Sequence, residues 1–389
     1  MKQTICLTMI VKNEIDVLKN AFDSVAHLLD YWVIADTGSD DGTQDFIKTY
    51  FKEKGIEGEL YEDEWVNFAH NRQLVSERAK NKADYHLTID ADEVLVPLKK
   101  DVPSLKEKIK KLPKFKEDLV RVYTHLNPWV YKRAQLFRGS LDWKWAEGLH
   151  EYPYCEQATS EEFFDSFCIY TEGGGSRGKE DNRLEADVRE LEKMLEEQPS
   201  GRNYYNLGMT HQSRTDYGPA IDAYTKCIEL TSWDEEKYLA YLSKAACMHY
   251  SGRMDGAVRE YSKATTIIPY RSEAYYYLAE MYFHKNEYMI SKVLLEYASK
   301  LPFPKGELSL VDKEVTEWKI QDVLSLCYYE EGKYKEAYKL LKSVLRSKTV
   351  KIFDKAQRHR LENNFALFKR VHGYPRKVQK EIREKKEKE

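Results

Sequence analysis

Long apolar runs, paired cysteines and a strong net charge are all missing from this 389-residue sequence. No apolar run reaches the roughly 20 residues that span a bilayer, so we expect no membrane-spanning segment. The six cysteines include no Cys-x-x-Cys pair, which argues against a zinc site or a disulfide scaffold and favours a cytoplasmic protein with reduced thiols. The formal net charge of −3 gives no overall basic field for nucleic acid, although it does not exclude a local basic groove.

The composition that is present belongs to a folded chain with more than one core. Hydrophobic residues make up 42% of the sequence and charged residues 33%, which is typical of globular proteins rather than disordered ones. A chain of 389 residues exceeds one ordinary hydrophobic core. We therefore expect two domains.

The first 100 residues alternate between strand and helix patterns. Short apolar runs at residues 4–11, 31–35, 59–61 and 85–89 predict strands. Apolar residues at helical spacing predict helices at 15–29, 42–54 and 69–80. This order indicates a mostly parallel sheet with right-handed crossovers, as in Rossmann-like α/β folds.

Polar clusters follow three of these strands, at the points where the strands end. They are Lys12-Asn13-Glu14, Asp36-Thr37-Gly38-Ser39-Asp40 and Asp90-Ala91-Asp92-Glu93. The carboxyl ends of parallel strands lie on one edge of the sheet, where such folds bind ligands. Carboxylate oxygens are the ligands that Mg²⁺ and Mn²⁺ prefer. The sequence thus predicts a cation and ligand site on this edge, against the plainer reading of solvated loops and helix caps.

The chain changes character beyond residue 120. Strand patterns at 120–123, 133–137 and 167–170 are joined by aromatic-rich loops that contain Trp129, Trp143 and Trp145. Gly173-Gly174-Gly175-Ser176 then predicts a flexible hinge or lid. From residue 182 onward the pattern is helical.

The helical part carries a degenerate repeat. Small residues recur at Ala220, Ala257, Ser291 and Ala337, each followed by larger residues four positions later. A spacing near 34 residues with small residues at helix contacts is typical of tetratricopeptide repeats. The longer last step predicts an insertion at residues 303–314. An ordinary helical bundle is the alternative.

The ordered blocks in the first 93 residues resemble those of nucleotide-sugar glycosyltransferases of family 2, which have the GT-A fold. The blocks are Met9–Glu14, Ile34–Thr43, Phe68–Arg72 and Ile89–Glu93, the last resembling that family's "DXD" metal motif. Gln135–Arg138 and Gly148–Glu151 resemble a subgroup in which tetratricopeptide repeats follow the catalytic domain. That subgroup includes peptide S-glycosyltransferases that modify bacteriocins.

The resemblance assigns roles to individual residues. It implies that Asp92 is a catalytic metal ligand and that His150 and Asp90 complete the metal site. Glu151 is the candidate general base, and Glu147 and Asp142 are its rivals. It implies nucleotide binding by Val11, Asn13, Glu14, Asp36, Arg72 and Asp90. Arg177 and Lys179 follow the glycine run at residues 173–175, and we expect this basic segment to close over the diphosphate, with a solvated helix start as the alternative.

The resulting hypothesis is a metal-dependent, inverting hexosyltransferase that uses Mn²⁺ or Mg²⁺ and a UDP-sugar, with UDP-glucose expected. We expect a GT-A domain at residues 1–175, a linker helix at 176–200, tetratricopeptide-like repeats at 201–370 and a charged tail at 371–389. The repeats would hold a peptide, protein or glycan acceptor, or a protein partner. Two alternatives remain open, namely glycosylation of a modified DNA base, as in viral enzymes, and a catalytically inert repeat scaffold.

Overall fold

The computed structural model describes residues 2–99, 102–347 and 355–373. Its contacts divide the chain into two compact units, Met1–Thr215 with Glu307–Leu310, and Asp216–Gly306 with Val311–Glu389. The charged tail predicted at 371–389 lies outside the described residues from residue 374 onward.

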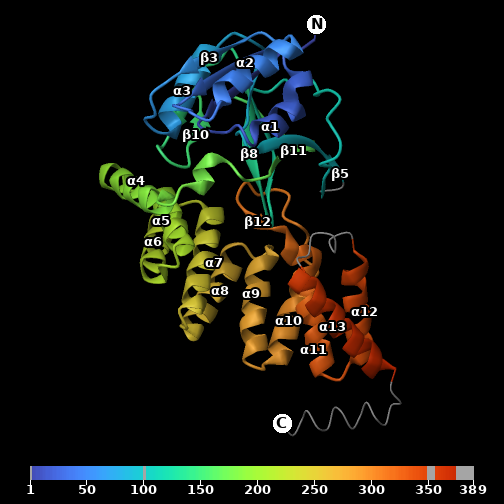
Figure 1. The fold of residues 1–389 in the computed structure, drawn as a ribbon. Coiled ribbons are helices and arrows are strands. Elements are labelled where there is room, and N and C mark those ends of the chain that lie inside the picture. The colour runs from blue at the N-terminus through green and yellow to red at the C-terminus, as the bar shows by residue number, and fades with distance from the viewer. Residues whose placement is uncertain (1, 100–101, 348–354, 374–389) are drawn as a thin grey trace. The chain divides into compact units, whose positions relative to one another are not determined.

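The first unit begins with the alternating strands and helices that the sequence predicts (Figure 1). The strands are β1 (Ile5–Val11), β2 (Tyr31–Asp36), β3 (Gly58–Glu62) and β4 (Tyr85–Thr88). The helical segments between them are α1 (Leu18–Val25), the 3₁₀ turn η1 (Ala26–Leu28), α2 (Thr43–Lys54) and α3 (Phe68–Ala79). β1 pairs in parallel with β2 and β4, and β2 pairs in parallel with β3. The carboxyl ends of these strands therefore share one edge.

β1 is buried on both faces, and its side chains show which helices cover each face of the sheet. Leu7 joins one apolar cluster with Phe22 of α1 and Phe51 of α2. Its neighbour Cys6 points to the other side of the sheet and joins a cluster with Val75 of α3. Because successive side chains of a strand face opposite sides, α1 and α2 cover one face and α3 covers the other.

The second half of the sheet is mostly antiparallel and extends the first half. Its strands are β5 (Glu93–Lys99), β6 (Val102–Pro103), β7 (Leu119–Leu126), β8 (Trp129–Arg138) and β11 (Glu161–Thr171). The order across the sheet is β3-β2-β1-β4-β8-β7-β11-β5-β6. β9 (Lys144–Ala146) and β10 (Tyr152–Tyr154) form a separate antiparallel pair. The sequence pattern does not predict β5, in which Pro97 interrupts an otherwise strand-like run.

Helices complete the first unit. They are the 3₁₀ turn η2 (Ser176–Lys179), α4 (Arg183–Glu197) and α5 (Gly201–Ser213). The Ser200 side chain accepts a hydrogen bond from the Asn203 N–H at 3.1 Å and so caps the start of α5. α4 lies within the segment predicted as a linker helix.

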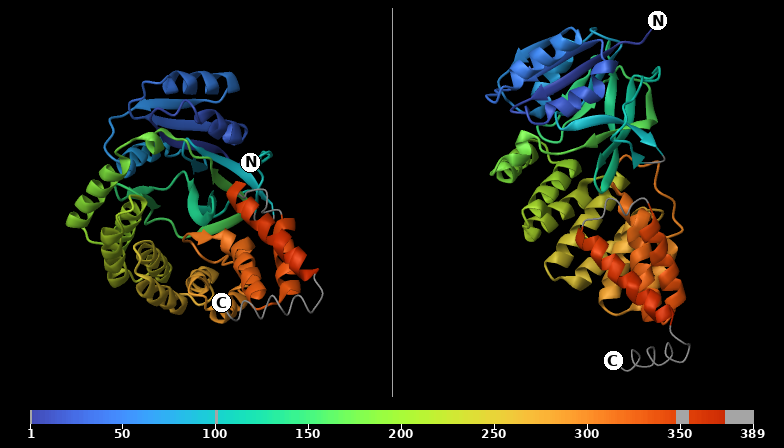
Figure 2. Two further views of the ribbon diagram at one scale, coloured as in Figure 1. Left: turned by 60° about the horizontal axis from the view of Figure 1, so that its bottom comes forward. Right: turned by 45° about the vertical axis from the view of Figure 1, so that its right-hand side comes forward.

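The second unit is a row of helices, which Figure 2 shows as a curved array. They are α6 (Tyr217–Leu230), α7 (Asp234–Tyr250), α8 (Met254–Ile267), α9 (Ser272–His284), α10 (Tyr288–Ala298), α11 (Ile320–Glu330), α12 (Tyr334–Arg346) and α13 (Lys355–His372). Within the predicted insertion at residues 303–314 the chain forms β12 (Val311–Asp312), and the π-helical turn η3 (Val315–Lys319) follows it.

The repeat signature coincides with the packing of this unit. The recurring small residues Ala220, Ala257, Ser291 and Ala337 are all fully buried. Small side chains let neighbouring helices approach closely, which explains their recurrence. The predicted fold class, an α/β domain followed by a helical repeat, is confirmed.

Two other expectations from the sequence concern the membrane and the cysteines. None of the described helices is both long and apolar enough to cross a bilayer. All six cysteines are free thiols, and five of them are buried.

Candidate active site

The three polar clusters that follow β1, β2 and β4 lie on one edge of the sheet, as predicted. Val11 at the end of β1 is aligned with Asp36 at the end of β2. Val11 O accepts hydrogen bonds from the N–H and the hydroxyl of Thr37, at 2.9 and 3.1 Å. The parallel register thus brings loops that are distant in sequence to the same place.

Asp36 is fully buried, and its two carboxylate oxygens differ in their hydrogen bonding. Its Oδ1 accepts hydrogen bonds from the N–H groups of Gly38 and Ser39, at 3.0 and 2.9 Å, and from Gln44 Nε2 at 3.1 Å. Its Oδ2 is buried and has no hydrogen-bond partner among residues 2–99, 102–347 and 355–373. Buried polar atoms are normally satisfied, so this oxygen is free to accept a hydrogen bond from a ligand.

Asn13 holds the loop after β2 in place. Its backbone is left-handed, with φ of 56°, a conformation that asparagine tolerates better than most residues. Its N–H donates to Ser39 Oγ at 2.8 Å, and its Oδ1 accepts from the Asp40 N–H at 2.8 Å. Glu14 is anchored in the same way, through a 2.9 Å hydrogen bond from its N–H to Thr43 Oγ1.

Asp90 is held between two arginines. Arg72 Nη2 lies 2.5 Å from Asp90 Oδ1, and Arg133 Nη1 lies 3.6 Å from Asp90 Oδ2. Arg133 also forms an ion pair with Glu93, whose side chain accepts a 2.9 Å hydrogen bond from the Asp90 N–H. Burial alone would raise the pKa of Asp90, but Arg72 and Arg133 outweigh it and keep that pKa below its ordinary value.

Asp92 behaves in the opposite way. Burial, together with the nearby charge of Asp90, raises the pKa of Asp92 above its ordinary value. Burial also raises the pKa of Glu14, and the charge of Asp92 adds to the effect, although Ser176 donors oppose it. Two carboxylates one residue apart, Asp90 and Asp92, are therefore tuned in opposite directions by their surroundings.

The segment Gly173–Lys179 lies against the carboxylates of Glu14 and Asp92, and we call it the strap. The Ser176 N–H lies 3.2 Å from both Glu14 carboxylate oxygens, and its hydroxyl donates to Lys12 O at 2.5 Å. Two strap glycines, Gly173 and Gly174, have φ of 77° and 92°, which other residues rarely adopt.

The strap cations Arg177 and Lys179, predicted to contact a diphosphate, have protein partners. Arg177 forms an ion pair with Asp187 and lies 4.8 Å from the ring centre of Phe68. Lys179 Nζ lies 3.1 Å from an oxygen of Asp16. To contact a diphosphate, Arg177 would have to leave Asp187 and Lys179 would have to leave Asp16.

Glu151 and His150 occupy different environments. Arg72 Nε donates to Glu151 Oε1 at 2.5 Å, and the Glu151 side chain is only 13% exposed. His150 is exposed, has a left-handed backbone with φ of 58°, and its carbonyl accepts from Arg202 Nη2 at 3.0 Å. Of the rival bases, Asp142 is paired with Lys80, and Glu147 lies 3.5 Å from Arg202.

Within the part of the chain that the structure describes, no group of three or more His, Cys, Asp or Glu side chains is arranged to hold a metal ion. Asp90, Asp92 and His150, which the sequence predicts as metal ligands, are therefore not arranged as a shared metal site. The residues nevertheless fit a divalent cation, because Glu14 and Asp92 are half-buried carboxylates that both approach Gly175, and partial burial raises the pKa of each.

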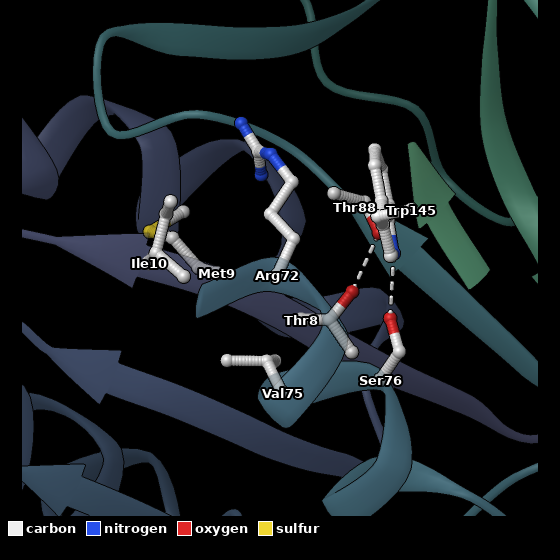
Figure 3. A pocket seen from close by; sticks show the side chains of 8 residues that line it. All are labelled: Thr8, Met9, Ile10, Arg72, Val75, Ser76, Thr88 and Trp145. Carbon is white, nitrogen blue, oxygen red and sulfur yellow. Dashed lines mark hydrogen bonds between the residues drawn. The ribbon is translucent and has the colours of Figure 1, made fainter. Parts of the chain in front are cut away.

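A small cavity lies behind Arg72 (Figure 3). Its lining residues are Thr8, Met9, Ile10, Arg72, Val75, Ser76, Thr88 and Trp145. Hydrogen bonds of 2.6 Å between the hydroxyls of Thr8 and Thr88, and of 2.9 Å from Trp145 Nε1 to Ser76 Oγ, fix its walls. In Figure 3 the Arg72 guanidinium points away from Thr8 and Val75. Arg72 therefore forms one wall of this cavity.

Sequence reasoning missed Arg133 altogether. The residue lies on β8, which pairs with β7 and β4, and it reaches Glu93 across 40 positions of sequence. The available signal is the Arg-x-Gln pattern of a strand, in which Arg133 Nε donates to Gln135 Oε1 at 3.0 Å. Such a pattern does not reveal which carboxylate the arginine meets.

Comparisons with known proteins agree with this architecture. Residues 6–171 match the model of glycosyl transferase family 2, and residues 201–232 match a tetratricopeptide repeat model. No curated protein gave a significant match.

Similar solved structures include MamA, BtubC from P. vanneervenii and the APC/C hetero-tetramer Cut9-Hcn1. Their identities to this chain are 20%, 15% and 18%, with TM-scores of 0.36, 0.39 and 0.38. The alignments cover 43%, 51% and 48% of this chain, and 90%, 85% and 33% of those chains. Likenesses this weak carry no argument about function. The family models do: the chain contains a glycosyl transferase family 2 domain at residues 6–171, followed by a tetratricopeptide repeat at residues 201–232.

Proposed function

We propose that this protein is a cation-dependent, inverting hexosyltransferase that uses a UDP-sugar, with UDP-glucose as the expected donor. Family 2 enzymes generally use a nucleotide-sugar donor and a divalent metal. The observation that carries the proposal is the edge of the sheet on which the open oxygen of Asp36 and the carboxylates of Glu14 and Asp92 lie together.

Asp36 is our candidate for recognising the base. Uracil presents an N3–H donor, and a buried carboxylate oxygen without a partner is a suitable acceptor. Because Oδ1 is already fixed by two backbone N–H groups, the orientation of Oδ2 is set before the nucleotide arrives. Asn13 would contribute by holding the loop that carries these donors.

Asp92 and Glu14 would hold the cation, together with oxygens of the donor diphosphate. A divalent cation there would stabilise the negative charge that develops on departing UDP. The choice between Mn²⁺ and Mg²⁺ stays open. We assign Asp90 a supporting role, because both of its oxygens face arginines.

Glu151 is our candidate for the general base. In an inverting transfer, the acceptor attacks the anomeric carbon as the bond to UDP breaks, and a carboxylate takes the acceptor proton. The Glu151 side chain is fixed by Arg72, which leaves the second oxygen to face the acceptor. Asp142 is the weaker candidate, since its side chain is 56% exposed and that of Glu151 only 13%.

The acceptor we propose is a peptide or protein, with a glycan as the second choice. A tetratricopeptide repeat suits binding of an extended or helical segment. The narrower relation to bacteriocin S-glycosyltransferases remains part of this proposal, and a DNA base remains an outcome for the acceptor screen.

Thermal unfolding tests the donor assignment directly. The protein is heated with UDP-glucose, UDP-N-acetylglucosamine, UDP-galactose or GDP-mannose, with and without Mn²⁺. Ligand at 100-fold above its dissociation constant adds about 2.7 kcal/mol to the free energy of unfolding, which raises the melting temperature by a few degrees.

The matched variants are Asp92→Asn and Asp23→Asn, the latter removing a carboxylate of α1 that pairs with Lys19. We expect a Mn²⁺-dependent shift with a UDP-sugar in the wild type and in Asp23→Asn, and none in Asp92→Asn. The absence of any shift in the wild type would instead favour an inert repeat scaffold.

A further inference from the structure

Arg72 occupies the centre of the site rather than its surface. Arg72 is 8% exposed. Its Nη2 lies 2.5 Å from Asp90 Oδ1, and its Nε lies 2.5 Å from Glu151 Oε1. These two carboxylates come from different loops, one after β4 and one after β9. The guanidinium fork therefore connects two sides of the site that are 61 positions apart in sequence.

The surroundings of Arg72 fix its direction. Its guanidinium carbon lies 5.3 Å from the ring centre of Trp145, which is itself tied to Ser76 by a 2.9 Å hydrogen bond. The cavity behind Arg72 is lined by the hydroxyls of Thr8 and Thr88, which bond to each other. A planar guanidinium held on one face by a ring keeps two bonds in a defined geometry, which a lysine could not.

The charge of Arg72 is already compensated on both sides. Asp90 and Glu151 each take a short ion pair, and Arg133 supports Asp90 from its other oxygen. Gripping a diphosphate would weaken one of these pairs. Glu151 would be the costlier partner to release, because its side chain is 13% exposed, whereas that of Asp90 is 36% exposed and also lies 3.6 Å from Arg133. This arrangement does not suit the phosphate-binding role that the sequence resemblance implies.

We propose that Arg72 is a positioning residue that locks Glu151 to Asp90, so that the base stands at a fixed place relative to the acidic turn that carries Asp92. The inference rests on the proposed glycosyl transfer. Arg72 itself takes no proton. It holds Glu151, which accepts the acceptor proton while the bond between the sugar and UDP breaks.

The test compares Arg72→Gln and Arg72→Lys with Arg138→Gln. Arg138 is a matched control, because it pairs with Asp118 at 2.7 Å and lies 5.3 Å from the ring of Tyr85, at the opposite end of β4. For each variant, UDP affinity with Mn²⁺ is measured by calorimetry. The rate of UDP release from the UDP-sugar is measured with water, or an identified acceptor, as nucleophile.

We expect the Arg72 variants to keep UDP affinity within about 3-fold of the wild type while kcat falls about 10²-fold, the usual contribution of a positioned base. If Arg72→Gln does not fold, Arg72→Lys allows the same comparison of UDP affinity with kcat, because it retains the buried positive charge. Arg138→Gln should leave both quantities unchanged.

A double variant separates positioning from other roles. If Arg72 acts through Glu151, Arg72→Gln combined with Glu151→Gln should be no slower than Glu151→Gln alone. Additive losses would overturn the inference, as would UDP affinity that falls in step with kcat, which would indicate a phosphate contact. If the wild type binds UDP and Glu151→Gln releases UDP as fast as the wild type does, the inference is also overturned, while the donor assignment stands. A wild type that neither binds UDP nor releases it would overturn the proposed function itself.

Discussion

Glu14 and Asp92 face each other across Gly175. An ideal β-carbon at this glycine would lie 3.5 Å from Asp92 Oδ2 and 3.5 Å from both Glu14 carboxylate oxygens. Burial is the larger cause of the raised pKa of each carboxylate, and their mutual repulsion adds to it at Glu14. The strap N–H of Ser176 meets part of this negative charge, so a cation at the pair would compete with the strap.

This competition predicts that Mn²⁺ loosens the strap. In the absence of nucleotide, Mn²⁺ should increase the rate of trypsin cleavage after Arg177 and Lys179, by about 5-fold or more if opening governs cleavage. Ser176→Ala, which removes the hydroxyl bonds to Lys12 and Glu14, should increase cleavage without Mn²⁺. Mass spectrometry of the fragments checks both.

Asp92→Asn supplies the control for the strap experiment. It removes one of the two proposed cation ligands, so Mn²⁺ should no longer change the cleavage rate in this variant. Protection of the strap by Mn²⁺ alone, or an equal effect in Asp92→Asn, would contradict the proposed competition.

The stability of the α/β unit should depend on pH through His86. This imidazole is buried in β4 and makes a 2.8 Å hydrogen bond with Ala79 O, and burial lowers its pKa to about 4. Between pH 4 and 6.5 the unfolded chain binds a proton here that the folded chain does not. The free energy of unfolding therefore rises with pH through this window, by roughly 3 kcal/mol at 1.36 kcal/mol per pH unit.

Urea denaturation at pH 4.5 and pH 7 measures this contribution. His86→Gln keeps a hydrogen-bonding side chain but cannot titrate, so the difference between the two pH values should shrink. His70→Gln, at an exposed position of α3, should leave the difference unchanged. An unchanged pH dependence in His86→Gln would show that other groups dominate acid unfolding.

The parts of the site that sequence reasoning could predict are those set by strand order. Asp36 and Asp92 follow strands, and parallel pairing brings strand ends to one edge whatever the detailed packing. The ion pairs of Arg133 with Glu93 and of Arg72 with Glu151 depend on pairings across 40 and 79 positions, which no local pattern specifies. The approach of Gly175 to Glu14 depends on the path of β11 and is equally non-local.

Gly58 illustrates a further requirement that composition does not reveal. A β-carbon at this position of β3 would lie 2.3 Å from the Trp32 ring, which is stacked on Phe51 at 4.7 Å and bonded to Ile56 O. Because the ring cannot move aside, Gly58→Ala should lower the free energy of unfolding by about 1–3 kcal/mol. Gly178→Ala, where no atom lies within 4 Å, should change it by less than about 0.5 kcal/mol. Equal urea midpoints for the two variants would refute this account.

The two oxygens of Asp36 predict how nucleotide preference can be changed. In Asp36→Asn the side-chain oxygen should remain where Oδ1 is, since the N–H groups of Gly38 and Ser39 need an acceptor. The amide NH₂ would then replace the open Oδ2. Uracil N3–H is a donor and would meet another donor, whereas cytosine N3 is an acceptor and would be satisfied.

Calorimetry with UDP and CDP, each with Mn²⁺, measures this change. Leaving a buried donor unpaired costs about 1–3 kcal/mol, so UDP affinity should fall roughly 10- to 100-fold while CDP affinity holds or rises. Asp41→Asn is the matched control in the same loop, because Asp41 bonds to the N–H groups of Ile15 and Thr43. That variant should affect both nucleotides alike. If UDP and CDP affinities fall together in Asp36→Asn, Asp36 holds the loop and does not read the base, and recognition of uracil must come from another residue on this edge.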